Sequence, residues 1–246
     1  MSSTSETGHA KNVSNFETLE ISCTGFGVRY NPKKASLKLP ALGIKYTAAD
    51  AELTKVRHLL PLYETPSNAR KILFKPFTKL VTNIVNAVKA SDVTIEFIAN
   101  VKTIARKLQG KRATPKIVDN PATPEDESKK SISASQMSFD MRIENFGKLI
   151  ELLESNDGYD PNEPELTTVT LTALRASMIA ENTAAKTAYT PLDNARISRD
   201  VVLYDPETGL VKVATDVKSY VKSVFGATSD EFKQVSKLKF VVIENK

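Results

Sequence analysis

The chain has 246 residues, with 34 lysines and arginines against 29 aspartates and glutamates, two histidines and one cysteine. A single cysteine excludes an intrachain disulfide framework and a cysteine cluster for structural zinc. The chain shows no signal-like leader, and no run approaches the roughly 18 apolar residues of a membrane span, so we expect a protein of the reducing cytoplasm that does not contact membranes.

The first half of the chain is predicted to be helical between residues 13 and 109, after a disordered tail over residues 1–12. A leading helix runs from Asn15 to about Ser22, and the next carries apolar residues from Leu42 to Tyr63. The third helix begins near Pro76, because proline cannot continue a preceding helix. The third and fourth helices carry apolar residues at helical spacing: Phe77, Leu80, Val81, Ile84, Val85 and Val88 in the third, and Phe97, Val101, Ile104 and Leu108 in the fourth.

Residues 110–135 separate the two halves. This stretch holds three prolines, many small polar residues and few apolar ones. Because little apolar surface is available to offset the entropy cost of ordering, we interpret it as a flexible linker.

The second half, residues 136–246, is predicted to hold a similar set of helices. The first covers 139–154, and Asn162, with a proline and a glutamate in the first turn, opens a long second helix. A third starts at Leu210 and ends before Gly226, a position typical of a helix C-cap. Thr228 and Glu231 have the spacing of a capping box that opens a short last helix. The composition of residues 168–172 and 241–243 is typical of strands and argues against an all-helical fold, but the longer helical period outweighs it.

Matching blocks recur between the halves at a spacing close to 130 residues. A rival register near 113 does not persist through the repeat. Ordered blocks at near-constant spacing indicate an internal duplication, so we predict an all-α fold of two tandem four-helix-bundle-like repeats, 13–109 and 136–246, joined by a flexible linker. The paired blocks are Asn15-Phe16 with Asn145-Phe146, Tyr30–Pro32 with Tyr159–Pro161, Asn68–Arg70 with Asn194–Arg196, and Leu73–Val81 with Leu203–Val211. We interpret the two Tyr-x-Pro motifs as interhelix turns with an aromatic plug.

Charge divides unequally along the chain. Residues 1–118 hold 19 basic and 8 acidic side chains, whereas residues 119–246 hold 15 basic and 21 acidic ones. Such an asymmetry indicates either association between a basic and an acidic repeat or contact with nucleic acid. The candidate contacts to nucleic acid or to an acidic partner are Lys75, Lys79, Lys102, Arg106, Lys107, Lys111, Arg112 and Lys116.

Residues that could carry chemistry are few. His9 falls in the expected tail and His58 in the middle of an expected helix, where we interpret it as solvated. Cys23 is interpreted as a small buried side chain, since a reactive thiolate needs a basic neighbour. Gly25 and Gly27 lack the third glycine of a dinucleotide-binding turn, and no phosphate loop occurs. We therefore predict no catalytic, cofactor-binding or metal-binding residues and no enzymatic activity.

Several short motifs stand out along the chain: Cys23–Gly27, Tyr30–Pro32, Gly110–Ala113, Tyr204–Leu210, Tyr220–Ala227 and Gln234–Lys237. Together they resemble the motifs of a family of duplicated, all-helical bacterial proteins to which no function is assigned. The resemblance implies the all-helical, two-repeat organisation and transfers no functional residue.

The hypothesis that best fits the sequence is a non-catalytic helical scaffold or protein-interaction protein, with self-association between its repeats or a protein partner. The alternative is nucleic-acid or ribosome binding through the basic first repeat and the arm at residues 110–112. Against it, the basic residues carry no cluster of stacking aromatic side chains.

Overall fold

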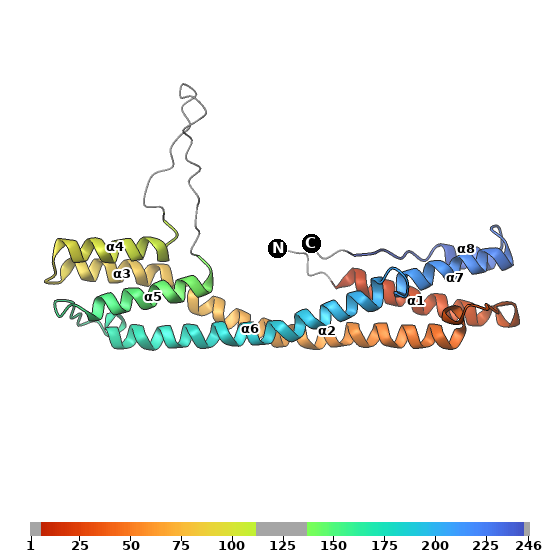
Figure 1. Ribbon diagram of the computed structural model, residues 1–246, viewed down its shortest axis with the longest axis horizontal. Helices are drawn as coiled ribbons and strands as arrows, with labels where there is room; N and C mark the ends of the chain where they lie inside the picture. Colours follow the sequence, from red (N-terminus) through yellow and green to blue (C-terminus); the bar gives the residue numbers. More distant parts are fainter. Residues whose placement is uncertain (1–5, 112–136, 244–246) are drawn as a thin grey trace, which may run out of the picture. The chain divides into compact units, whose positions relative to one another are not determined.

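The computed structural model describes residues 6–111 and 137–243, and every regular element within those ranges is helical (Figure 1). The predicted all-α class is confirmed. The α-helices are α1 (Thr7–Gly25), α2 (Leu39–Phe74), α3 (Phe77–Ala90), α4 (Ile95–Leu108), α5 (Phe139–Glu154), α6 (Thr168–Tyr204), α7 (Leu210–Phe225) and α8 (Asp230–Ser236). Short 3-10 turns lie at Gly27–Arg29, Ala35–Leu37 and Pro164–Leu166.

The chain forms two compact units, and each draws on both halves of the sequence. Unit 1 combines Met1–Tyr63 with Ala188–Lys246, and unit 2 is Glu64–Thr187. The long helices α2 and α6 contribute to both units. This packing differs from an arrangement in which residues 13–109 and 136–246 each form a bundle on their own, because the helices of one half contact helices of the other.

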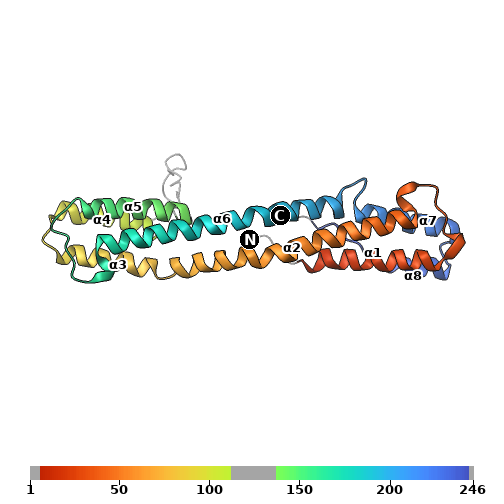
Figure 2. The ribbon, with the colours of Figure 1, turned by 90° about the horizontal axis from the view of Figure 1, so that it is seen from below.

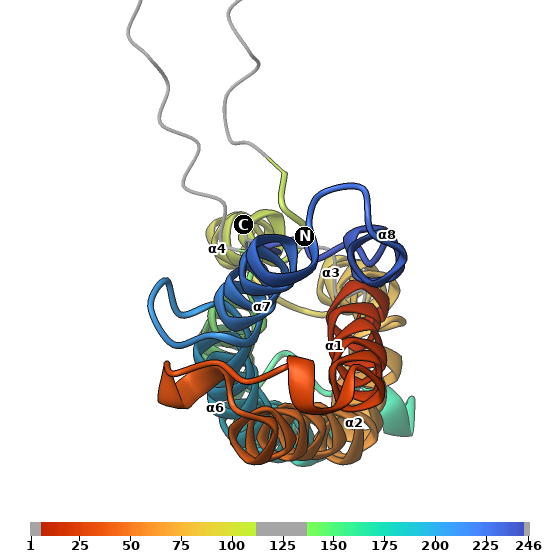
Figure 3. The same cartoon turned by 90° about the vertical axis from the view of Figure 1, so that its right-hand side faces the viewer.

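Unit 1 is built around α1, which contacts α7 and α8 (Figure 2, Figure 3). Its core includes Phe16 and Leu19 of α1, Leu42 of α2, and Val217 and Val221 of α7, all of them fully buried. Complete burial of such a side chain contributes about 1.5–3 kcal/mol, which makes this apolar contact the main support of the unit.

Unit 2 is built around α4, which contacts α3 and α5. Phe77, Val81, Ile84 and Val88 line the buried side of α3 and confirm the helix predicted from their spacing. The rings of Phe77 and Phe146 meet edge to face, with centroids 4.9 Å apart, a favoured aromatic geometry.

Each half contains a tyrosine that closes the turn before its long helix. The Tyr30 hydroxyl donates to the Leu37 carbonyl at 2.7 Å, and the Tyr159 hydroxyl donates to the Leu166 carbonyl at 2.8 Å. Both tyrosines are buried. The interhelix turns with an aromatic plug predicted from the Tyr-x-Pro motifs are therefore confirmed.

Three predicted boundaries are wrong. Helix α1 begins at Thr7, because burial of His9 and Val13 continues its apolar face into residues assigned to the tail. Asn162 does not open the long helix, since the 3-10 turn at Pro164–Leu166 intervenes and α6 starts at Thr168. The cap of α8 is Ser229, whose hydroxyl accepts a hydrogen bond from the Phe232 amide at 3.1 Å.

The remaining local predictions separate by segment. Gly226 follows α7 with φ of 95°, as predicted for a glycine cap. Residues 168–172 lie in α6, so the helical period correctly outweighed their strand-like composition. Residues 241–243 are neither helix nor strand but continue an irregular C-terminal segment. The linker prediction falls almost entirely outside the described residues.

Candidate functional site

A cluster of buried polar side chains joins α1 to α6 in unit 1. We call it the α1–α6 cluster. His9 and Arg199 expose only 3% and 1% of their surfaces. Buried polar and charged groups are stable only when they are hydrogen-bonded or paired, so the partners within this cluster decide what it can do. Its members are Glu6, His9, Asn12, Arg196, Arg199, Asp200 and Tyr204.

Arg199 is held between two carboxylates. Its guanidinium donates to the Glu6 carboxylate and, through Nε at 2.8 Å and Nη2 at 2.7 Å, to Asp200. Arg196 adds a second cation 3.7 Å from Glu6. The two positive and two negative charges balance, so Arg199 is a neutralised structural cation rather than an open anion site.

His9 is neutral within this network. Its Nδ1 and the Tyr204 hydroxyl are 2.7 Å apart and share a hydrogen bond, and the hydroxyl accepts a hydrogen bond from the Asn12 side-chain amide at 3.2 Å. Burial, followed by the neighbouring Arg199 cation, lowers the pKa of His9, and the carboxylates of Glu6 and Asp200 oppose that shift. The Nδ1 atom of His9 and the Tyr204 hydroxyl are thus each bonded to another member of the cluster.

The sequence contained a signal for this cluster that the tail assignment overlooked. His9, Val13, Phe16 and Cys23 continue one helical stripe, and residue 9 lies on its buried side. A helix extended toward the N-terminus would have placed His9 on the core side of α1.

The two other candidate groups for catalysis are inert or isolated. Cys23 is completely buried, and burial raises the pKa of its thiol to about 12. The interpretation as a small buried side chain is confirmed, because a thiol with that pKa is not a nucleophile at neutral pH. His58 is exposed on α2, in agreement with a solvated helix position.

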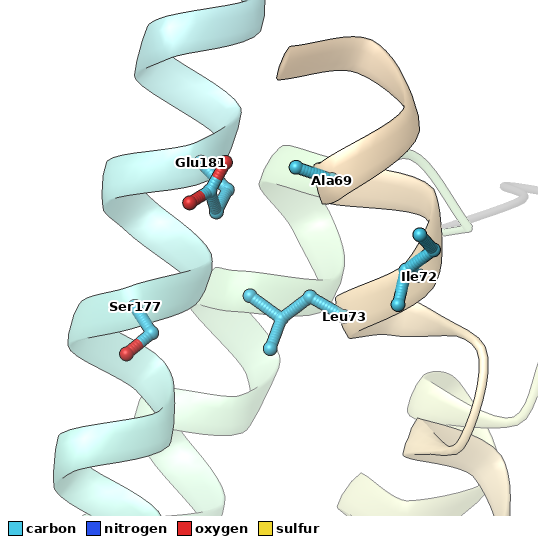
Figure 4. Close-up of a pocket in the computed structure, with 5 residues that line it drawn as sticks. All are labelled: Ala69, Ile72, Leu73, Ser177 and Glu181. Atoms are coloured by element: carbon cyan, nitrogen blue, oxygen red, sulfur yellow. The ribbon is translucent and has the colours of Figure 1, made fainter. Parts of the chain in front are cut away.

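A shallow groove of about 360 Å³ lies in unit 2 between α2 and α6 (Figure 4). Ala69, Ile72 and Leu73 line it from α2, and Ser177 and Glu181 from α6. The Ser177 hydroxyl donates to the carbonyl of Ala173 in its own helix at 3.1 Å. Ile72 is 72% exposed at this groove. The lining thus offers apolar surface and one carboxylate rather than a converging set of polar groups.

The basic residues predicted as contacts lie on the outer faces of α3 and α4. Among the ion pairs of the described residues, none includes one of these side chains. Arg112 and Lys116 lie outside the part of the chain that the structure describes. The described members are all exposed: Lys75 just before α3, Lys79 in α3, Lys102, Arg106 and Lys107 in α4, and Lys111 after it.

The oppositely charged halves meet inside the chain. Lys34 lies 2.7 Å from Asp216, and Arg29 lies 3.3 Å from Glu231, so basic residues of the first half pair with acidic residues of the second in unit 1. Counted by unit, unit 1 holds 17 basic and 13 acidic side chains and unit 2 holds 17 and 16. The asymmetry along the sequence is largely cancelled by the packing.

In residues 6–111 and 137–243 no group of three or more histidine, cysteine, aspartate or glutamate side chains could hold a metal ion. Among the described helices, none combines the length and apolar composition needed to cross a membrane. Comparison of the chain with protein-family models, with curated proteins and with solved structures finds no match.

Proposed function

We propose that the chain is a non-catalytic helical interaction protein, built from an internal duplication, that docks another protein on its helices. The observation that carries the proposal is the groove of unit 2, where Ile72 is 72% exposed beside Ala69 and Leu73. Apolar side chains exposed at a groove are typical of protein contact surfaces. The charged side chains of the α1–α6 cluster, in contrast, are paired with one another.

The duplication is supported by matched elements. Each half runs from a first helix through a Tyr-closed turn and a 3-10 turn into a long helix, followed by two shorter helices. The long helices α2 and α6 have 36 and 37 residues. Because the two copies pack on each other in both units, their complementary charges are used within the chain. The docking surface for another protein is then the apolar groove rather than the charged faces.

A capture experiment with three forms of the full chain tests this role. Ile72→Glu places a charge in the groove, whereas Ile44→Glu is a matched control, because Ile44 is equally exposed on α2 in unit 1. We expect quantitative mass spectrometry to find at least one protein that the wild type and Ile44→Glu capture and that Ile72→Glu loses. The same captured proteins for all three forms would contradict the proposal.

Nucleic-acid binding is the second candidate, supported by the exposed and unpaired basic residues of α3 and α4. A labelled duplex titrated between 50 and 200 mM salt measures it. Replacing Lys102, Arg106 and Lys107 by Gln should flatten the slope of log affinity against log salt by about three if these groups contact phosphates. The matched control replaces three exposed lysines of unit 1, Lys33, Lys38 and Lys237. Equal slopes for both triple variants, or no binding at 50 mM, would exclude this candidate.

A further inference from the structure

The C-terminal segment of the described chain, residues 238–243, lies against α1 in an irregular conformation after α8. Leu238 and Phe240 pack against the core of unit 1, and Ile243 is half-buried. Val241 and Val242 remain 60% and 55% exposed. The segment is thus docked by a few apolar side chains while others face solvent.

The polar contacts to this segment are made to its backbone. Lys218 of α7 donates to the Leu238 carbonyl, and Asn15 donates to the Lys239 carbonyl at 2.6 Å. Asn12 donates to the Val241 carbonyl at 2.7 Å and accepts from the Val241 amide at 3.0 Å. Asn12 is 2% exposed, so a buried side-chain amide bonds both the carbonyl and the amide of Val241.

The contacts from α1 form one stripe, Gly8, Asn12 and Asn15, which we call the α1 stripe. Spacings of four and three residues place these positions on the same face of a helix. At Gly8, an added Cβ would lie 2.4 Å from Cδ1 of Ile243, so the absence of a side chain makes room for the segment. The α1 stripe thus supplies space for the segment and side-chain hydrogen bonds to its backbone.

We infer that the α1 stripe is a binding groove for an extended peptide, which the chain's own residues 238–243 occupy and a peptide of another protein can take over. The peptide carries apolar residues where Leu238, Phe240 and Ile243 sit. Recognition through backbone groups depends little on the outward side chains, so different peptides can satisfy the same Asn12 and Asn15 contacts. Lys218 lies 5.0 Å from the Phe240 ring centroid and favours an aromatic residue at that position.

The seated segment is suited to displacement. Val241 and Val242 are mostly exposed, and a segment with few buried side chains opens locally at lower free energy than packed helices do. Release would uncover Asn12, whose amide would then lack its backbone partner. A competing extended peptide restores those hydrogen bonds. This inference rests on the proposed interaction role and names the kind of partner, but it concerns α1 and not the groove beside Ile72.

Fluorescence polarisation with a labelled synthetic peptide of residues 238–243 tests the inference on the full chain. Val241→Pro removes the backbone N–H that donates to Asn12, and it changes a side chain that is mostly exposed. We expect this variant to release the chain's own segment from α1. We expect the peptide to bind this variant at least tenfold more tightly than the wild type. A peptide N-methylated at the Val241 amide should bind at least tenfold more weakly.

Changes in the α1 stripe identify the site. Added to Val241→Pro, Asn12→Ala should abolish peptide binding. Asn15→Ala, which removes a more exposed amide and spares the core, should weaken it severalfold, and Asn100→Ala on α4 should leave it unchanged. No saturable binding to a folded Val241→Pro chain, or binding that neither α1 variant weakens, would overturn the inference.

Dimerisation of Val241→Pro in the absence of peptide, measured by light scattering, would assign the groove to a second copy's segment and overturn the foreign-peptide partner. The peptide titration needs no native partner. Its failure is therefore distinguishable from a failure of the Ile72 capture experiment.

Discussion

The two units place a ring pair at matching positions but build it from different chemistry. At the predicted offset of 130, His9 corresponds to Phe139 and Tyr204 to Phe74. The His9 and Tyr204 rings lie 5.6 Å apart in unit 1, and the Phe139 and Phe74 rings lie 4.8 Å apart in unit 2. Each pair connects the first turn of one half's leading helix to the end of the other half's long helix.

The chemistry of each ring pair determines which partners its surroundings must supply. In unit 2 the apolar rings need no hydrogen-bond partner, and Arg70 covers the Phe139 ring at 4.1 Å. In unit 1 the polar pair requires a satisfied network, which Asn12, Arg199 and two carboxylates supply. We therefore expect unit 1 to be sensitive to charge and pH at this position and unit 2 to depend on packing.

We expect the largest effect on stability from the loss of Arg199. Arg199→Ala leaves Glu6 and Asp200 without their buried cation, and removing one partner of a buried ion pair costs about 3–5 kcal/mol. Denaturant unfolding, with hydrogen exchange of α1 to locate the loss, measures this effect. The control Arg57→Ala removes an exposed arginine of α2 and should change the stability by less than about 0.5 kcal/mol. Equal losses of stability for Arg199→Ala and Arg57→Ala would contradict the structural role of Arg199.

A reciprocal exchange of one hydroxyl tests whether either ring pair tolerates the polarity of the other. Tyr204→Phe leaves His9 and Asn12 short of a hydrogen bond, and Phe74→Tyr introduces a hydroxyl into an apolar site. Each change should cost about 1–3 kcal/mol, because an unsatisfied buried polar group carries its full desolvation penalty. Thermal unfolding of both variants checks this. Stabilisation by Tyr204→Phe would show that the hydroxyl network is unnecessary.

Acidification from pH 7 to pH 5 should affect unit 1 through His9. The folded pKa of His9 lies below its usual 6.5, so the unfolded chain binds the proton more readily. The contribution of His9 is present above pH 6.5 and is lost as the pH falls through the folded pKa, by at most about 1.4 kcal/mol per pH unit. Hydrogen exchange, corrected for intrinsic rates, should show α1 loosening between pH 7 and 5. His9→Phe should remove that dependence, and persistence of it would contradict the assignment.

The smallest effect is expected at an exposed pair in unit 2. Lys186 lies 2.5 Å from Asp140, and this hydrogen bond is the main cause that lowers the pKa of Asp140. Because both side chains are exposed, Lys186→Ala should cost only about 0.2–1 kcal/mol. Thermal unfolding should give different stabilities for wild type and variant at low salt and nearly equal stabilities at 0.5 M salt. A loss as large as that of Arg199→Ala would contradict the contrast between buried and exposed pairs.

The sequence predicted those features that local rules determine. The spacing from Phe77 to Val88 specified α3, Gly226 specified the end of α7, and the Tyr-x-Pro motifs specified the two closed turns. Such features depend on residues within one or two turns of each other. They follow from helix periodicity and turn chemistry alone.

The composition of the units and of the α1–α6 cluster could not be predicted in this way. His9 and Tyr204 are 195 residues apart, and Asn12 meets Val241 across 229 residues. A single sequence gives periodicity but not which helices share a core. The charge asymmetry was compatible with association of the halves and with contact to nucleic acid. Within unit 1 the two halves are joined by the ion pairs of Lys34 with Asp216 and of Arg29 with Glu231.

The most direct test of the account is to divide the chain between residues 112 and 136 and purify the two halves separately. If each unit needs helices from both halves, neither half will unfold cooperatively alone. Mixing will then restore helical circular dichroism and give a 1:1 complex by sedimentation. Two halves that each unfold cooperatively as monomers, and that do not associate when mixed, would contradict our conclusion that the two halves of the chain complete each other's cores.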